Sequence, residues 1–220
     1  MSPAARSIAL RASYGVLALG VLVGLGLEVR SALTMDPGAA ITRTERLVRL
    51  FSYFTIQSNL LVLIASVLVV AAPDRGGRLR AVLRLDALLC IAVTGVIYHA
   101  LLSGYAATLA PAGQVSNFLL HTVSPIAAWV IWLVLGPRGD LRWSTVGWAV
   151  AYPLAWIAYT FVRGAITGWY PYDFLDAGAL GLGRALLNTA AVAAGFLLLA
   201  ALVRGLDRVL PGGTGRAPTR

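Results

Sequence analysis

Six long apolar segments constrain the fold of this chain more than any other feature of its sequence. They cover approximately residues 8–27, 47–72, 81–105, 117–135, 144–166 and 183–203. Each is close to or longer than the roughly 20 residues that an α-helix needs to cross a bilayer. Because the hydrocarbon core offers no water to backbone groups, spans of this kind form helices. The sequence therefore predicts an all-α polytopic membrane protein with six transmembrane helices in one bundle.

The remaining segments are expected to be loops and a tail. Residues 28–46 and 106–116 contain Pro and Gly and are predicted loops. Residues 1–203 are predicted to form the transmembrane domain, and the polar residues 204–220 to form a disordered cytoplasmic tail. The composition agrees with a membrane protein, since 59% of residues are hydrophobic and only 12% are charged.

The basic residues predict the orientation of the chain. All 18 are arginine; twelve fall on the side that holds both termini and six on the other. Cytoplasmic loops carry an excess of basic residues, so both termini are predicted to be cytoplasmic, in the cell membrane. The net charge of +9 is explained by these loops and tails, and no nucleic-acid partner is predicted. The single cysteine, Cys90, excludes an internal disulfide and a thiolate metal cluster.

Polar side chains interrupt the second span near its start. Thr55, Ser58 and Asn59 are spaced at i, i+3 and i+4, so a helix places them on one face, while Gln57 points elsewhere. Polar groups at membrane depth are costly unless they face a protein interior or a cavity. In the predicted orientation this face lies in the outer-leaflet half, about 12 Å along a helix that begins at residue 47.

Four further polar residues lie in the other spans. His121 can be a base, a ligand, a proton relay or a packing group, and Asn117 lies one turn earlier on the same face. His99 lies nearer the end of its span, where it can sit among headgroups. Arg163 can pair with a substrate carboxylate or extend to the interface. No metal-ligand spacing is present, so neither a metal nor a cofactor is predicted.

A hydroxyl beside a histidine indicates nucleophilic catalysis. A threonine hydroxyl is hardly ionised at neutral pH, so its attack on a carbonyl needs a neutral imidazole that accepts the proton. Thr55 and His121 could form such a pair, although spacing alone does not show that their helices are neighbours. Asn59, Ser58 or Asn117 could then stabilise the oxyanion or orient the histidine.

In the first span, Gly20 and Gly24 form a small-xxx-small pair that allows close helix packing.

Three short motifs resemble the signatures of the androgen-induced membrane proteins, the family that includes the androgen-dependent TFPI-regulating protein. They are Tyr53-Phe54-Thr55, then Asn117-Phe118-Leu119-Leu120-His121-Thr122 with Pro125, and Thr167-Gly168-Trp169-Tyr170-Pro171. Members with known activity are six-helix membrane threonine hydrolases that cleave fatty acid esters of hydroxy fatty acids. The resemblance implies that Thr55 is the nucleophile and His121 the base. The chain departs from the animal proteins in its first loop, in residues 57–59 and in its short arginine-only turns.

The expected function is therefore intramembrane hydrolysis of a lipid ester. Candidate substrates are fatty acid esters of hydroxy fatty acids or related lipid esters, and the expected partners are membrane lipids. Two alternatives stay open at the level of sequence. One is a non-enzymatic protein that binds or transports a lipid or small molecule, and the other is an assembly partner whose polar groups only specify helix packing.

Overall fold

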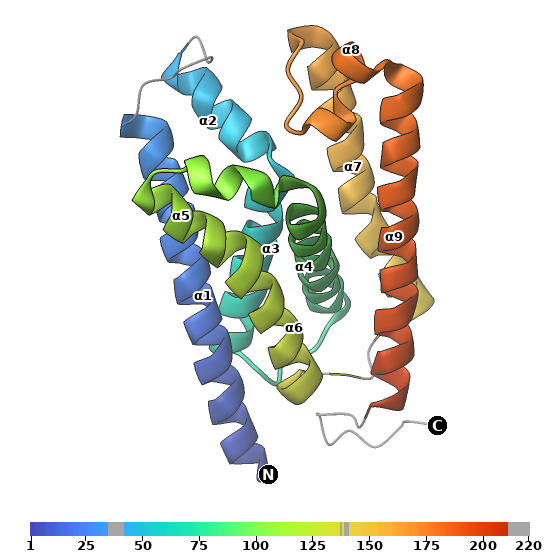
Figure 1. The fold of residues 1–220 in the computed structure, drawn as a ribbon. Coiled ribbons are helices and arrows are strands. Elements are labelled where there is room, and N and C mark those ends of the chain that lie inside the picture. The colour runs from blue at the N-terminus through green and yellow to red at the C-terminus, as the bar shows by residue number, and fades with distance from the viewer. Residues whose placement is uncertain (35–41, 137, 139–140, 211–220) are drawn as a thin grey trace.

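Six membrane-spanning helices form the body of the protein. The computed structural model describes residues 1–34, 42–136, 138 and 141–210. Within these residues six helices are long and apolar enough to cross a membrane, and no strand is present. The predicted all-α polytopic bundle is thus confirmed (Figure 1).

The spans are built from one or several helical elements each. They are α1 (Pro3–Thr34), α3 (Phe54–Ala71), α4 (Arg78–Ile97) with the π-helical turn η1 (Tyr98–Leu102), α5 (Pro111–Phe118) with the π-helical turn η3 (Leu119–Val123) and α6 (Ser124–Leu135), α7 (Trp143–Thr167), and α9 (Leu182–Val209). Four short elements connect them: α2 (Arg43–Ser52), the 3-10 helices η2 (Ser103–Thr108) and η4 (Asp173–Leu175), and α8 (Ala177–Leu180).

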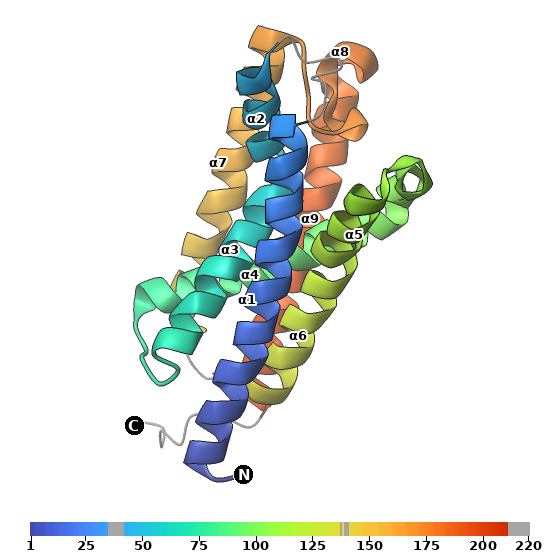
Figure 2. The same ribbon diagram turned by 90° about the vertical axis from the view of Figure 1, so that its left-hand side faces the viewer.

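Helix α4 lies at the centre of the bundle. It contacts α3 and α6 on one side and α7 and α9 on the other, as Figure 1 shows. Its residues Leu89, Cys90 and Ile91 are completely buried, so the lone cysteine is a small core residue. Figure 2 shows α1 running the length of the bundle beside α3 and α6, with which it packs.

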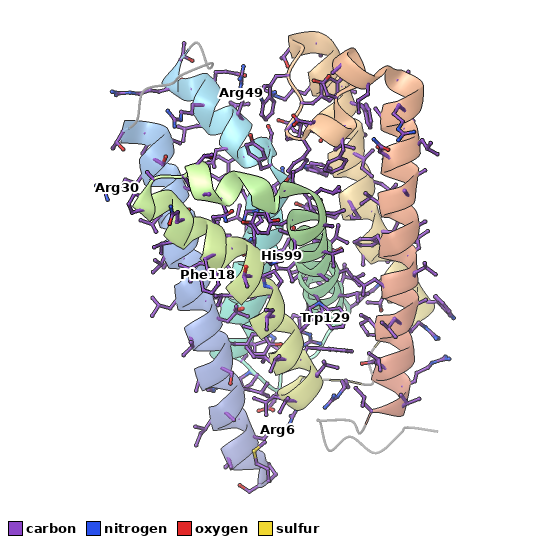
Figure 3. The ribbon with its side chains drawn as sticks, viewed as in Figure 1. Arg6, Arg30, Arg49, His99, Phe118 and Trp129 are labelled. Carbon is purple, nitrogen blue, oxygen red and sulfur yellow. The ribbon has the colours of Figure 1, made fainter. Side chains whose placement is uncertain are left out.

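The first turns of α1 and the last turns of α9 lie at the same end of the bundle (Figure 1), as an even number of spans requires. Near this end Arg6, labelled in Figure 3, donates to the carbonyl of Leu135 at 2.6 Å and so provides a partner for a carbonyl at the C-terminal end of α6. Helix α9 continues to Val209, six residues past the predicted end at residue 203. The rest of the predicted tail, residues 211–220, lies outside the described residues.

The segment 28–46 differs from the predicted loop, because α1 continues to Thr34 and α2 begins at Arg43. The N-cap Thr42 accepts from the backbone N–H of Glu45 at 3.1 Å. A threonine with a glutamate three residues later is a capping-box sequence that starts a helix. Residues 35–41 lie outside the described residues. The predicted loop 106–116 likewise contains the start of α5, with Pro111 in its first turn.

The second predicted span is wrong in one respect, because it is not a single helix from residue 47 to residue 72. Tyr53 has an extended backbone, with φ −66° and ψ 131°, and it separates α2 from α3. Thr55 consequently lies in the first turn of α3 and not 12 Å along a continuous helix. This break is the feature on which the candidate site is built.

Candidate active site

Three side chains replace the helical partners that are lost at the break. Gln57 Nε2 donates to Phe51 O at 2.7 Å, Trp156 Nε1 donates to Ser52 O at 3.0 Å, and the phenol oxygen of Tyr172 accepts from Thr55 N at 3.3 Å. Buried backbone groups without partners are costly, and broken helices persist in membranes only where other groups satisfy them. The network therefore stabilises an α-helix start inside the protein, with Thr55 in its first turn.

Thr55 lies directly beside His121. The Thr55 Oγ1 and His121 Nε2 atoms are 3.1 Å apart, and His121 Nδ1 is 3.1 Å from the carbonyl oxygen of Asn117. Because a carbonyl can only accept, the Nδ1 atom carries the proton of the neutral imidazole. Nε2 then has a free lone pair directed at the threonine hydroxyl, the arrangement that a general base requires. The ring of Tyr98 stacks on the imidazole at 4.2 Å and holds its plane.

The π-helical turn η3 explains why Asn59 is needed. Within this turn the N–H of Ser124 donates to Leu119 O, and Pro125 has no N–H to donate. The carbonyl of Leu120 is therefore left without a donor in its own helix. Asn59 Nδ2 donates to this carbonyl at 3.1 Å and to Thr55 O at 2.9 Å. Asn59 thus ties the helix of the nucleophile to the turn of the histidine.

Ser58 and the Asn117 side chain have other partners. Ser58 Oγ lies 3.1 Å from Thr55 O and 2.8 Å from Thr94 Oγ1, so it links α3 to α4. Asn117 Nδ2 donates to the Tyr98 hydroxyl, while its backbone carbonyl orients the histidine. The side chains of both residues therefore support the pair and make no hydrogen bond to Thr55 Oγ1.

His99 and Arg163 lie outside the Thr55–His121 pair. His99, labelled in Figure 3, has its Nε2 atom 3.2 Å from Thr122 Oγ1. Its exposed ring lines a cavity that includes neither Thr55 nor His121. Arg163 Nη2 is 2.7 Å from Glu45 Oε1, and its guanidinium lies 4.7 Å from the Trp169 ring. Arg163 lines neither cavity that contains Thr55.

Thr55 lies where two cavities meet. The inner cavity, of about 140 Å³, lies between α3, α4, α7 and α9, and its lining is almost entirely apolar. The outer cavity, of about 470 Å³, is more polar and contains His121, Glu28 and Asp173. Thr55, Leu102 and Tyr172 line both. The nucleophile candidate can therefore contact a ligand that reaches from a polar opening into an apolar interior.

Sequence reasoning missed three aromatic residues of this site: Tyr98, Trp156 and Tyr172. Aromatic residues near span ends usually belong to the interfacial belt, which is where Tyr98 and Tyr172 are expected. Trp156 lies in the middle of its span among apolar residues, where it is expected to be a packing residue. The polar tips were the available signal, since a buried Tyr or Trp normally finds a hydrogen-bond partner.

In the described part of the chain, no group of three or more His, Cys, Asp or Glu side chains could hold a metal ion.

The fold and this arrangement define the class: a six-helix integral membrane protein with a paired threonine and histidine between its helices. Comparison with protein-family models, with curated proteins and with solved structures found no match to the chain.

Proposed function

We propose that this protein is an intramembrane lipid ester hydrolase with Thr55 as nucleophile and His121 as general base. The observation that carries the proposal is the 3.1 Å contact between Thr55 Oγ1 and His121 Nε2, with Nδ1 oriented by Asn117 O. Nucleophile, base and orienting group in one hydrogen-bonded series are the signature of an activated hydroxyl.

In the first half-reaction the bond between Thr55 Oγ1 and the ester carbon forms, and His121 Nε2 takes the hydroxyl proton. The carbonyl electrons move to its oxygen, which becomes an oxyanion. When the intermediate collapses, the bond to the alcohol oxygen breaks and His121 returns the proton to that oxygen. In the second half-reaction water replaces Thr55 by the same proton transfers, and the free acid leaves.

The two cavities can hold the two sides of the proposed ester. The apolar inner cavity accepts the acyl chain, while the polar outer cavity accepts the alcohol part and the water for deacylation. A lipid chain leaves an apolar bilayer to enter an apolar cavity, so little hydrophobic free energy is gained. The inner cavity therefore serves mainly to hold the carbonyl beside Thr55, and proximity of this kind lowers the barrier.

The family resemblance adds support to this assignment. Its motifs contribute Thr55, Asn117 and His121, which lie within hydrogen-bond reach of one another in the order threonine, histidine, backbone carbonyl. Fatty acid esters of hydroxy fatty acids, or related lipid esters, are the candidate substrates. The excess of arginine in the turns and tails on the side of the two termini supports cytoplasmic termini and a site in the outer half of the membrane.

One observation favours a second candidate, a lipid-binding or transport protein without chemistry. Discontinuous helices whose N-termini point into a membrane protein often bind ligands in transporters, and α3 begins in this manner at Phe54. The paired histidine supports the hydrolase over this candidate, since a binding site has no need of a base beside a hydroxyl.

Covalent labelling tests the proposal. Purified protein is incubated with a long-chain fluorophosphonate, its intact mass is measured, and hydrolysis of a hydroxy-fatty-acid ester is followed in parallel. We expect labelling and turnover in the wild type, and loss of both in Thr55→Ala and His121→Ala. Thr160→Val is the control, because Thr160 is a buried threonine outside both cavities. A folded wild type that neither labels nor turns over the ester would favour the binding protein.

A further inference from the structure

The hydroxyl of Tyr172 lies beside Thr55 but takes no part in the proton transfers between Thr55 and His121. Its oxygen lies 3.3 Å from Thr55 N and 3.4 Å from Thr55 Oγ1. Tyr172 also belongs to the small group of residues that line both cavities. A ligand that passes from the outer to the inner cavity must therefore pass this phenol.

Neighbouring rings hold the phenol in place. The Tyr172 ring stacks on Phe174 with a centroid distance of 5.4 Å and an interplanar angle of 15°. It also meets Tyr53 edge-on at 5.6 Å and lies 6.2 Å from Trp156. A group whose orientation is held by its surroundings needs no reorganisation during a reaction, which is the condition for effective electrostatic stabilisation.

The hydrogen bonds determine where the phenol proton can point. The phenol oxygen accepts from the backbone N–H of Thr55. With Nε2 of His121 unprotonated, the Thr55 hydroxyl donates to that atom, so in the 3.4 Å contact between the two hydroxyls the phenol is the donor and Thr55 Oγ1 the acceptor. Burial raises the pKa of Tyr172 to about 12, so the phenol keeps its proton at neutral pH and remains a donor.

We propose that Tyr172 is a third catalytic residue, which donates its hydroxyl hydrogen bond to the oxyanion that forms when Thr55 attacks an ester. The proposal rests on the proposed hydrolase function. As the carbonyl electrons move to the oxygen, the Tyr172 O–H turns from Thr55 Oγ1 to that oxygen. No proton is transferred from Tyr172, and the bond is released when the carbonyl re-forms.

The geometry meets the requirement for such a donor. The oxyanion and Thr55 Oγ1 are bonded to the same carbon, so the two oxygens are close together. An effective donor lies about 2.7–3.1 Å from the oxyanion, and a phenol 3.4 Å from Thr55 Oγ1 can donate to the oxyanion from its present place when the carbonyl oxygen is on the Tyr172 side of Thr55. The side chains of Asn59, Ser58 and Asn117, which were the candidates from sequence, are bound to other groups.

Tyr172→Phe tests the proposal, because it removes the hydroxyl and keeps the ring stack. We expect kcat to fall by about 10²–10³-fold, the usual loss for one oxyanion donor, with KM nearly unchanged. Tyr159→Phe is the matched control, since it also removes a phenol hydroxyl that is bound to a neighbour, Ser52, but outside both cavities. That control should retain wild-type kcat.

Two inhibitors separate catalysis from a structural role. A trifluoromethyl ketone analogue of the ester forms an oxyanion on Thr55, whereas an ether analogue does not. In Tyr172→Phe the affinity for the ketone should fall by the same factor as kcat/KM, and the affinity for the ether should stay at the wild-type value. Equal losses for the two inhibitors, or an unchanged kcat, would overturn the proposal.

A polyfluorinated tyrosine at position 172 gives an independent measurement on a fully folded protein. Fluorination lowers the phenol pKa, and a phenolate cannot donate, so the alkaline loss of kcat should move to lower pH. An unmoved alkaline limit would contradict the proposal. A wild type without labelling at Thr55 or turnover overturns the hydrolase itself, whereas an active wild type with an active Tyr172→Phe overturns only the role of Tyr172.

Discussion

Replacing Gly24 with alanine tests how closely α1 packs against the turn that carries His121. A Cβ atom at Gly24 would lie 2.7 Å from Leu120 Cδ2 and 2.9 Å from Leu120 Cγ. Leu120 is only 1% exposed, so its side chain has little room to move away. Gly20, the other member of the small-xxx-small pair, has no atom within 4 Å of the same position. Only one glycine of the predicted pair therefore lies at a close contact.

The two alanine variants form a matched pair. In both, alanine gains up to about 1 kcal/mol over glycine in helix propensity. In Gly24→Ala alone, the added methyl group must displace buried atoms, which typically costs about 1–3 kcal/mol. The propensity term cancels between the variants, so Gly24→Ala should be less stable than Gly20→Ala by about 1–3 kcal/mol.

Reversible unfolding in mixed micelles, followed by circular dichroism, measures this difference. Ester turnover is measured on the same samples, because displacement of Leu120 moves the adjacent His121 away from Thr55. We expect Gly24→Ala to lose activity and Gly20→Ala to keep it. Equal stability of the two variants would refute the packing argument.

Three other predictions concern the site and its surroundings. Asn59→Leu should lower the free energy of unfolding by about 1–3 kcal/mol, because it leaves a buried carbonyl of η3 without a donor. The control Ser66→Ala, at a buried hydroxyl of α3 without a partner, should leave the free energy of unfolding unchanged. Equal losses for the two variants in chemical unfolding would contradict this prediction. Ala193→Leu, which fills the inner cavity, should shift turnover toward shorter acyl chains in a chain-length series, whereas Ala194→Leu on the same helix should not. Hydrogen bonds from two arginines lower the pKa of Glu45, so its contribution to stability is present above the ordinary carboxyl pKa and is lost as the pH falls through the lower, folded value. Glu45→Gln should therefore flatten the acid side of a Tm-against-pH curve.

Residue type predicted much of the candidate site, because polar side chains in apolar spans need partners. The chemistry of a hydroxyl with a base and the family resemblance together predict the pair of Thr55 and His121, and the structure places the two side chains 3.1 Å apart. The partners of the supporting residues could not be predicted in the same way. Ser58 and Asn59 can bond to any carbonyl or hydroxyl nearby, and only the packing of helices determines which ones they meet.

The break at Tyr53 has no local signal. Neither proline nor glycine lies near it, and residues 47–72 have the composition of one long helix. Of the three side chains that stabilise the break, only Gln57 is local; Trp156 and Tyr172 lie 104 and 117 residues from the backbone groups that they bind. Local propensity contains no information on contacts this distant. The capping sequence at Thr42 was, by contrast, readable from four consecutive residues.

The π-helical turn η3 also divides its span into two phases. A π-helical turn holds one residue more than an α-helical turn, and each residue advances an α-helix by about 100°. Residues of α5 and residues of α6 therefore follow two separate helical wheels, which meet at Leu119–Val123. If the same residues were wound as a regular α-helix, one half of the span would turn by about 100° relative to the other. Such a span would have nearly the same hydrophobic length, yet it could no longer direct His121 and the Pro125 side of the helix toward their present neighbours at once.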